Sequence, residues 1–398
     1  MEKVKVGILP NQFLKSNGTF DKDEAIKLSG KIAGVCYDKE GFSHLENEPE
    51  EKTLRRVNMT LNSGHHSVYD HISISLNLQN IPKILAMVLN NESQYTTSEK
   101  SARYTEIERK DDSIITEDEA RLYNKWICLF KAKIKEKYGN IYSDSKIQKL
   151  AQENARYLVT VFMPTQMIYT TSLRQINYLA SWLQDYINSL DMNLEFNKKL
   201  ALSINQLLEN LDGLNILDDR LMKNAKHRKL SLFGKNLDDR EEYFGSVYST
   251  VYDGSFSSLA QAQRHRTLDY QMEMNDNKKY FIPPIIEDDP MLVAEWLEDI
   301  NSVGYVNPQG ELVKISELGT YDNFILKCKE RLCSAAQLEI MLQTRDTLLK
   351  YQKALEESKN PLADDIKQYT YGARCTFPDF ECSKSCNFSE GIRLVRKI

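Results

Sequence analysis

The sequence of 398 residues has no long apolar run and no excess of positive charge. No stretch approaches the roughly 18 consecutive apolar residues of a membrane-spanning helix, so we expect no membrane partner. The net charge of −5 argues against a general nucleic-acid binder, which would carry a basic excess. Any recognition of phosphate must therefore come from local clusters of basic residues.

The sequence also lacks the features of a secreted protein. Its first residues, MEKVKVGILPNQF, hold only a short apolar patch without a signal-peptide core or cleavage site. The seven cysteines are an odd number, which favours a reduced set in the cytoplasm over a disulfide framework. We expect no metal site. The alternative is a structural metal at Cys375, Cys382 and Cys386, which would need a fourth ligand and closer spacing.

The chain is long enough for two or three domains, at roughly 150 residues per domain. The alternation from His71 to Leu78 predicts a half-buried strand, and Pro82 suits the start of the helix that follows it. The polar, Ser- and Thr-rich segment 91–104 predicts a loop. Helical spacing of apolar residues predicts helices over 22–36, 49–63, 117–138, 146–158 and 172–188, and over 192–213, which we expect to bridge two halves.

The second half repeats this arrangement. Tyr243 to Tyr252 predicts a strand, and Ser255 to Arg266 a helix that ends in a basic triplet. An extended segment over 279–285 and helices over 287–300 and 321–357 follow. Strand, helix, basic or hydroxyl-rich loop and then helices thus occur twice, which indicates an internal duplication. On pattern alone, a chance resemblance between two α+β segments is the alternative.

The basic triplet Arg264-His265-Arg266 concentrates positive charge beside Gln261. Guanidinium groups bind phosphate in bidentate geometry, so the triplet suits a nucleotide better than a neutral metabolite. Taken alone, it is also typical of a solvated basic helix end. A second cluster, Ser101-Ala102-Arg103-Tyr104, combines a hydroxyl, an arginine and a tyrosine, and is a second candidate for binding phosphate.

The segment from Gly64 to His71, followed by an alternating strand and a helix, resembles the opening motif of the flavin-dependent thymidylate synthases. That family next carries Gln-x-x-Arg-His-Arg, seven residues, and Ser-x-Arg-Tyr. The first half keeps the Ser-x-Arg-Tyr element, with Glu99 before it, but has Val88 in the glutamine position and Asn91-Glu92-Ser93 in place of Arg-His-Arg. The second half keeps Gln-x-x-Arg-His-Arg and lacks Ser-x-Arg-Tyr in 272–277.

Later family motifs are divided in the same way. Ala155-Arg156, Thr165 and Ser172-Leu-Arg174 resemble the family's Ala-Arg, Thr and Asn-x-Arg run, with serine replacing the asparagine. The family's following Leu-Arg pair reads Trp182-Leu183, so the first half has lost that arginine. The second half restores it as Arg331, in a segment that resembles the family's Arg…Ala-Gln-Trp-Glu-Ile run.

The resemblance implies that the two halves complement each other, because family members are homotetramers whose active sites straddle subunits. It assigns Glu99, Ser101, Ala102, Arg103, Arg156, Gln261, Arg264 and Arg331 to dUMP, with Arg264 and Arg331 as the catalytic residues. It assigns His65, Ser67, Asp70, Ser172, Arg174, Tyr178, His265 and Arg266 to FAD. Each half would then have kept one side of a shared site, while the reciprocal site has decayed.

The expected fold is α+β, with two α/β halves that each combine a small antiparallel sheet with long helices and pack as a pseudo-dimer. The expected boundaries are 1–190 for the first half, 191–235 for a helical bridge, 236–360 for the second half and 361–398 for a cysteine-containing tail. By analogy with the family tetramer, we expect a homodimer of pseudo-dimers.

The implied activity is reductive methylation of dUMP to dTMP by a methyltransferase that uses FAD, with methylenetetrahydrofolate as carbon donor and NADPH as reductant. No pair of cysteine and histidine forms a convincing nucleophile, which fits chemistry carried by the cofactor. Two alternatives remain: a flavin- and folate-dependent pyrimidine nucleotide hydroxymethylase or related modifier, and a non-catalytic nucleotide-binding pseudoenzyme.

Overall fold

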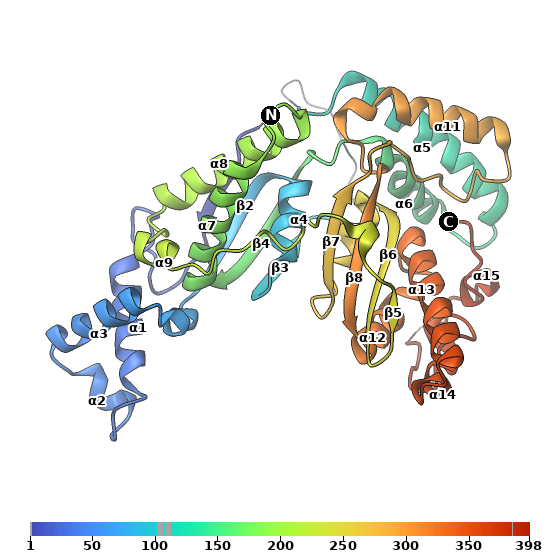
Figure 1. The fold of residues 1–398 in the computed structure, drawn as a ribbon. Coiled ribbons are helices and arrows are strands. Elements are labelled where there is room, and N and C mark those ends of the chain that lie inside the picture. The colour runs from blue at the N-terminus through green and yellow to red at the C-terminus, as the bar shows by residue number, and fades with distance from the viewer. Residues whose placement is uncertain (1, 102–106, 108–112, 384) are drawn as a thin grey trace. The chain divides into compact units, whose positions relative to one another are not determined.

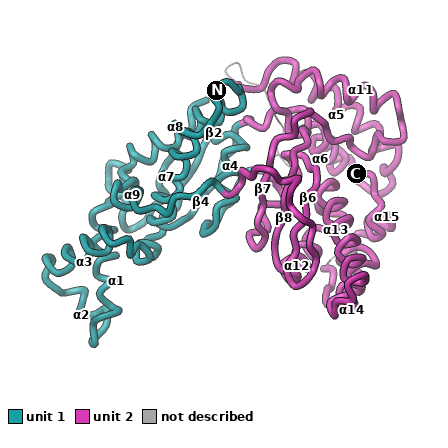
Figure 2. The backbone as a smooth tube through the Cα atoms, in the orientation of Figure 1, with its two compact units in different colours: residues 1–100, 164–230 teal, residues 101–163, 231–398 magenta. Residues whose placement is uncertain are grey.

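The computed structural model describes residues 2–101, 107, 113–383 and 385–398 (Figure 1). Over these residues the fold is α+β, with two four-stranded antiparallel sheets. The chain divides into two compact units (Figure 2). Unit 1 comprises residues 1–100 and 164–230, and unit 2 comprises residues 101–163 and 231–398. In the part of the chain described here, no helix combines the length and apolar character needed to cross a bilayer.

The sheet of unit 1 has the strand order β1-β2-β4-β3. Its strands are β1 (Lys5–Ile8), β2 (Ser73–Pro82), β3 (Tyr95–Glu99) and β4 (Pro164–Ser172). In β2, Ile74, Leu76 and Leu78 are buried on one face, because side chains alternate along a strand. Helices α4 (Lys83–Asn91), α7 (Leu173–Ser189) and α8 (Glu195–Gly213) pack on the sheet and on one another.

The remaining helices of unit 1 pack on one another and on α7. They are α1 (Lys22–Gly34), α2 (Phe42–Glu46), α3 (Glu50–Ser63), the 3₁₀ turn η1 (His66–His71) and α9 (Asp219–Lys223). Helices α1 and α3 approach closely at Gly30, where an added Cβ would lie 2.5 Å from Val57 Cγ2. A glycine at this position lets the two helix backbones meet.

The sheet of unit 2 has the order β5-β6-β8-β7, which matches that of unit 1 strand for strand. Its strands are β5 (Tyr243–Phe244), β6 (Val247–Ser255), β7 (Asp269–Met274) and β8 (Leu312–Thr320). Helix α10 (Phe256–Ala262) follows β6, and α12 (Tyr321–Arg331) and α13 (Leu338–Glu357) follow β8. Shorter elements are η3 (Leu237–Asp239), α14 (Leu362–Lys367), η5 (Arg374–Thr376) and α15 (Ser389–Ile392).

Unit 2 also contains a helical layer built from both halves of the sequence. It comprises α5 (Glu117–Tyr138), α6 (Asp144–Ala155), η2 (Arg156–Leu158), α11 (Pro290–Ser302) and η4 (Gly304–Val306). The Trp126 and Trp296 rings meet edge to face with centroids 4.9 Å apart, and both residues are fully buried. This apolar contact explains why 101–163 belongs to unit 2 although it lies between two strands of unit 1.

The strand registers fix which residues of the two halves correspond. Ser73 of β2 pairs with Ser172 of β4, and Val247 of β6 pairs with Thr320 of β8. The hydroxyls of Ser172 and Thr320 then cap the helix that follows, each accepting from the N–H three residues on. Counted from these caps, Arg331 takes the position of Leu183. The turns η2 and η4 also correspond, with Gly304 in the position of Arg156.

The helices after the first central strands correspond in the same way. Helix α4 begins at Lys83 and α10 at Phe256, so Gln261 takes the position of Val88. Continuing from there, Arg264, His265 and Arg266 take the positions of Asn91, Glu92 and Ser93. The structural correspondence therefore agrees with the motif comparison made from the sequence.

The segments after η2 and η4 hydrogen-bond to each other in a symmetric way. The Val161 N–H donates to the Asn307 carbonyl at 2.8 Å, and the Gln309 N–H donates to the Val159 carbonyl at 2.8 Å. Thr160 and Pro308 form an antiparallel bridge between these two bonds. Since Val159 corresponds to Asn307 and Val161 to Gln309, exchanging the two segments maps one hydrogen bond onto the other.

Several sequence predictions are corrected. The predicted loop 91–104 contains β3, an edge strand whose hydroxyl-rich sequence lacks apolar alternation. The predicted helix 255–266 ends at Ala262, because the chain must turn to enter β7, so the basic triplet lies in that turn. The predicted helix 321–357 is two helices, since tail residues bind the intervening segment at Leu332 and Ala336.

The unit boundaries also differ from the predicted domains. Residues 101–163 of the predicted first half pack in unit 2. The predicted bridge over 192–213 is α8, which packs against β1, α4 and α7 inside unit 1. An amphipathic pattern shows that a helix has a buried face but does not identify the surface that covers it.

We expect the contact between Trp126 and Trp296 to contribute to the stability of unit 2. A Trp296→Ala substitution removes a fully buried side chain, and we expect the free energy of unfolding to fall by about 3–5 kcal/mol. Urea denaturation measures this change. Met291→Ala on the same helix is the control, because Met291 is 83% exposed and its loss should change the free energy by less than about 0.5 kcal/mol.

Candidate functional site

Most residues predicted to bind the nucleotide lie in unit 2, around the buried carboxylate of Glu339. Glu339 Oε1 accepts from the Ser255 N–H at 2.8 Å, and its Oε2 accepts from the Ser255 hydroxyl at 2.6 Å. The Tyr157 hydroxyl donates to Oε2 at 2.8 Å and accepts from Gln337 Nε2 at 2.7 Å. This Glu339 cluster (Tyr157, Ser255, Gln337 and Glu339) joins η2 from the first half of the sequence to α10 and α13 from the second.

Arg156 directly precedes Tyr157 and is only 3% exposed. Within the described residues, its Nε and Nη2 atoms have no hydrogen-bond partner. A guanidinium stays charged at any physiological pH, and burying an unpaired charge costs several kcal/mol. An arginine in this state indicates an anionic partner beyond those that the described residues supply.

One face of α10 runs from the Glu339 cluster to two residues predicted to bind the nucleotide. Ser257, in the first turn, lies 3.4 Å from Gln337 Nε2. Gln261 is four residues further and therefore lies on the same face of the helix. Arg264 follows three residues later, just past the helix end, and is exposed. The helix thus presents a hydroxyl, an amide and a guanidinium in sequence along one side.

Arg331, the last residue of α12, is bound to the turn that holds the basic triplet. Its Nε–H donates to His265 Nε2 at 2.5 Å, and its Nη2 donates to the Gln261 carbonyl at 3.1 Å. Gln261, His265 and Arg331 are therefore neighbours, although 66 residues separate His265 from Arg331. Arg266, by contrast, is exposed.

His265 is buried, with 6% of its surface exposed. Burial, together with the nearby charges of Arg331 and Lys327, lowers the pKa of His265 to about 2. The ring is therefore neutral at physiological pH. Because Nε2 accepts from Arg331, the ring proton resides on Nδ1, which lies 3.3 Å from Glu330 Oε2.

In unit 1, four of the residues predicted to bind flavin come together. Arg174 donates from Nε to Asp70 Oδ1 at 3.0 Å, and its Nη2 lies 2.6 Å from Asp70 Oδ2. The Ser172 hydroxyl donates to Asp70 Oδ1 at 2.6 Å. The Arg174 guanidinium lies 5.6 Å from the centre of the Tyr178 ring. A hollow of about 450 Å³ adjoins this group and is lined by Asp70, Ser73, Gln94, Tyr95, Thr96, Thr170, Thr171 and Ser172.

The two histidines before this group have different roles. His65 and Ser67, which were predicted to contact flavin, are exposed. His66 is buried, and its ring nitrogens lie 2.9 Å from the Tyr178 hydroxyl and 3.0 Å from the Leu61 carbonyl. Burial lowers the pKa of His66. Sequence reasoning missed His66, because the phase of a short 3₁₀ turn cannot be deduced from two adjacent histidines.

The first-half residues assigned to dUMP are divided between the units. Glu99 lies in unit 1, where its carboxylate accepts from Lys83 Nζ at 2.6 Å and from Asn90 Nδ2 at 3.2 Å. Ser101 begins the segment that belongs to unit 2. Ala102 and Arg103 lie outside the described residues. A shared site for Glu99 and the unit 2 residues therefore stays a prediction.

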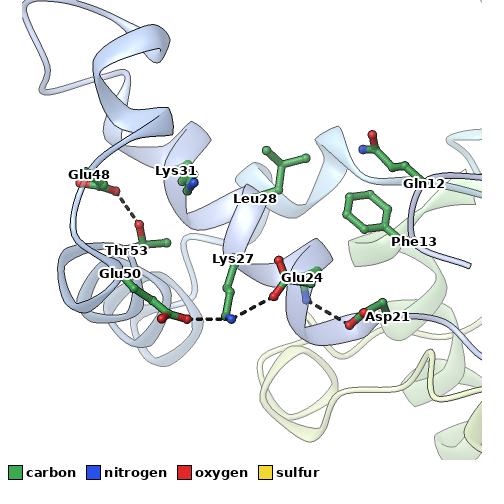
Figure 3. Close-up of a pocket in the computed structure, with 10 residues that line it drawn as sticks. All are labelled: Gln12, Phe13, Asp21, Glu24, Lys27, Leu28, Lys31, Glu48, Glu50 and Thr53. Atoms are coloured by element: carbon green, nitrogen blue, oxygen red, sulfur yellow. Dashed lines mark hydrogen bonds and ion pairs between the residues drawn. The ribbon is translucent and has the colours of Figure 1, made fainter. Parts of the chain in front are cut away.

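A second hollow in unit 1, of about 520 Å³, contains none of the predicted site residues (Figure 3). Lys27 bridges Glu24 at 2.9 Å and Glu50 at 2.7 Å across its wall. Glu48 accepts from the Thr53 hydroxyl at 2.6 Å and pairs with Arg56. The charges around this hollow therefore largely compensate one another within the chain.

The tail cysteines considered as metal ligands, Cys375, Cys382 and Cys386, are exposed and form no disulfide among the described residues. Across the described ranges, no group of three or more His, Cys, Asp or Glu side chains is placed to hold a metal ion.

Residues 20–182 match the model of a protein family described as thymidylate synthase complementing protein. The resemblance to flavin-dependent thymidylate synthases is thereby confirmed for this range. The range contains the four residues that come together in unit 1, which we call the candidate flavin group (Asp70, Ser172, Arg174 and Tyr178). Gln261, Arg264 and Arg331 lie beyond it.

Two curated relatives agree with this assignment. The chain is 23% identical over 145 residues to a flavin-dependent thymidylate synthase of Pyrococcus furiosus, and 22% identical over 148 residues to one of Thermococcus onnurineus. These matches cover 35% and 36% of this chain and 56% and 57% of the relatives. The chain thus spans little more than half the length of each relative.

A solved UMP/dUMP methylase, PolB from Streptomyces cacaoi bound with 5-Br dUMP, aligns at 14% identity with a TM-score of 0.33, covering 56% of this chain and 94% of PolB.

The Glu339 cluster predicts that the Tyr157 hydroxyl stabilises the fold. Tyr157→Phe removes one donor to Glu339 and the acceptor of Gln337, so we expect the free energy of unfolding to fall by about 1–3 kcal/mol. Tyr305→Phe is a matched control, since Tyr305 takes the corresponding position after η4 begins and is 62% exposed. Equal effects of the two substitutions in urea denaturation would contradict the role given to the cluster.

The low pKa of His265 predicts that the free energy of unfolding falls as the pH is lowered. Its folded-state pKa of about 2 lies below the ordinary value of 6.5, so its contribution to stability is complete above pH 6.5 and is lost as the pH falls toward 2. From about pH 7 to pH 5 this group alone should lower the free energy of unfolding by about 2 kcal/mol. His265→Gln should remove that part of the pH dependence, while the exposed His227→Gln should retain it.

Proposed function

We propose that this protein is a flavin-dependent thymidylate synthase in which two fused halves supply opposite walls of one nucleotide site. It would methylate dUMP to dTMP, with methylenetetrahydrofolate as carbon donor and NADPH as reductant of FAD. The observation that carries this proposal is the buried guanidinium of Arg156, whose Nε and Nη2 have no hydrogen-bond partner among the described residues. Its neighbour Tyr157 binds second-half residues through the Glu339 cluster.

The pattern of retained and lost residues supports a single site of this kind. Arg156 of the first half and Gln261, Arg264 and Arg331 of the second belong to the retained set. The reciprocal site would be formed by the corresponding positions of the opposite halves. These hold Met272, Met274 and Gly304 in place of Glu99, Ser101 and Arg156, and Val88, Asn91 and Leu183 in place of Gln261, Arg264 and Arg331. None of these replacements carries a positive charge, so we expect one nucleotide per chain.

The symmetric hydrogen bonds between residues 159–161 and 307–309 support a pseudo-dimer within the chain. A closed dimer has a self-complementary interface, in which each contact occurs twice with the partners exchanged. Two fused copies of an ancestral subunit would retain such paired contacts at their axis. By the same argument, two chains would replace the four subunits of the family assembly, giving a homodimer.

The side chains of the proposed site suit a nucleotide monophosphate. Arg156, Arg264 and Arg331 supply positive charge for a phosphate dianion, and each charge-assisted hydrogen bond contributes about 1.5–3 kcal/mol. The side-chain amide of Gln261 can both donate to and accept from a pyrimidine edge. The protein would thus hold the base and polarise it, while the cofactor carries the redox chemistry.

The candidate flavin group in unit 1 has a donor set that fits FAD. Its hollow is rich in hydroxyls, which match a polyol chain, and Arg174 beside it provides a guanidinium for a phosphate group. Asp70, Ser172, Arg174 and Tyr178 would hold the cofactor. When bound, FAD would supply the reducing equivalents that convert the transferred carbon into a methyl group.

The direct test is incubation of the purified protein with dUMP, methylenetetrahydrofolate and NADPH, followed by analysis of the nucleotide and of flavin content. Formation of dTMP supports the proposal. Oxidation of the flavin without dTMP contradicts it, and a hydroxymethylated product would identify the alternative modifier. Binding of dUMP by a protein without flavin or turnover would identify a pseudoenzyme.

The buried charge of Arg156 should strengthen dUMP binding and lower the stability of the protein without ligand. Arg156→Met should weaken dUMP binding by about 10- to 150-fold, the equivalent of one charge-assisted hydrogen bond. The free energy of unfolding without ligand should stay the same or rise, because a buried unpaired charge is removed. Arg121→Met, at a side chain that is 65% exposed, is the control for both measurements. Unchanged dUMP affinity in Arg156→Met would remove this arginine from the site.

A further inference from the structure

We propose that His265 is a positioning residue that orients the Arg331 guanidinium toward an anion without neutralising it. This inference rests on the proposed function and deepens it, because it gives His265 a role in binding the substrate phosphate. The resemblance to the family instead assigns His265 to the flavin.

The geometry places His265 behind Arg331. The Arg331 Nε–H donates to His265 Nε2, and the Gln261 carbonyl accepts from Arg331 Nη2. These two acceptors fix the plane of the guanidinium from two directions. The imidazole itself is buried, and its other nitrogen faces the Glu330 carboxylate. The donation from Arg331 itself selects the tautomer, because His265 Nε2 must carry a lone pair to accept it.

The corresponding position of the first half shows a contrasting arrangement. Glu92 takes the position of His265, and its buried carboxylate forms an ion pair with Arg228. The Arg228 guanidinium lies 3.7 Å from the ring centroid of Trp182, which takes the position of Glu330. This guanidinium is thus paired with a full negative charge and covered by an aromatic ring. Leu183 takes the position of Arg331. The first half therefore has neither the histidine nor the arginine at the two positions that correspond to His265 and Arg331.

The difference between the halves lies in the charge of the residue that binds the guanidinium. A carboxylate such as Glu92 compensates the charge of its arginine, which reduces the attraction for a further anion. A neutral imidazole fixes the geometry of Arg331 but contributes no negative charge. The low pKa of His265 keeps the ring neutral over the physiological range. His265 therefore orients Arg331 without adding a negative charge of its own, which suits recognition of a phosphate.

The experiment compares dUMP affinity, measured by calorimetry, with flavin content, measured by absorbance, in the full-length protein. His265→Ala should weaken dUMP binding at least tenfold and leave the flavin content unchanged. His265→Gln, whose amide oxygen can replace Nε2 as acceptor, should restore the affinity to within about threefold of the wild type. His227→Ala is the matched control, because His227 is an exposed histidine paired with Asp185, and it should not change the affinity.

A double-mutant cycle separates positioning from a general structural effect. In an Arg331→Ala background, His265→Ala should weaken dUMP binding no further, since the residue it positions is absent. Additive losses in the two variants would overturn the inference. Loss of flavin with dUMP affinity intact would also overturn it and support the flavin role. A wild-type protein that binds no dUMP would instead refute the proposed function, on which this inference depends.

Discussion

The hydrogen bonds to Glu339 are the constraint on which the candidate site in unit 2 depends. This one carboxylate accepts from Ser255 at the start of α10 and from Tyr157 in η2, so it fixes a turn of the first half against a helix of the second. Arg156 is adjacent to Tyr157 along the chain, and Gln261 lies one turn along α10 from Ser257. The Glu339 carboxylate thus holds the segment that contains Arg156 against the start of the helix that contains Gln261.

The charges of the arginines differ in their surroundings between the two units. In unit 1, Arg174 pairs with Asp70 and Arg228 pairs with Glu92, so both guanidiniums have an anionic partner. In unit 2, Arg156 is buried with two nitrogen atoms unpaired in the described structure, and Arg331 is oriented by a neutral histidine. Stability is lower when buried charges lack partners, and binding of an anion would recover the difference. The buried Nε and Nη2 atoms of Arg156, which have no hydrogen-bond partner among the described residues, are the physical basis for expecting an anion site in unit 2.

Part of this arrangement could be predicted from the sequence. The alternation in β2 and the helical spacing over 172–188 predicted strands and helices of unit 1, and the divided motifs predicted the correspondence between the halves. Strand β8 was missed because Glu317, which is fully buried and paired with Lys327, interrupts its apolar alternation. The packing of 101–163 in unit 2 could not be predicted, because it depends on the contact between Trp126 and Trp296. The hydrogen bond between Arg331 and His265 could not be predicted either, since the two residues are 66 positions apart along the chain.

The most direct measurement is a crystal structure of the protein with dUMP bound. The account predicts that the phosphate lies within hydrogen-bond distance of Arg156 and of Arg264 or Arg331 in the same chain, so that residues from both halves hold one ligand. A phosphate bound by residues of one half alone, or located at the positions of Val88, Leu183 and Gly304, would contradict the account.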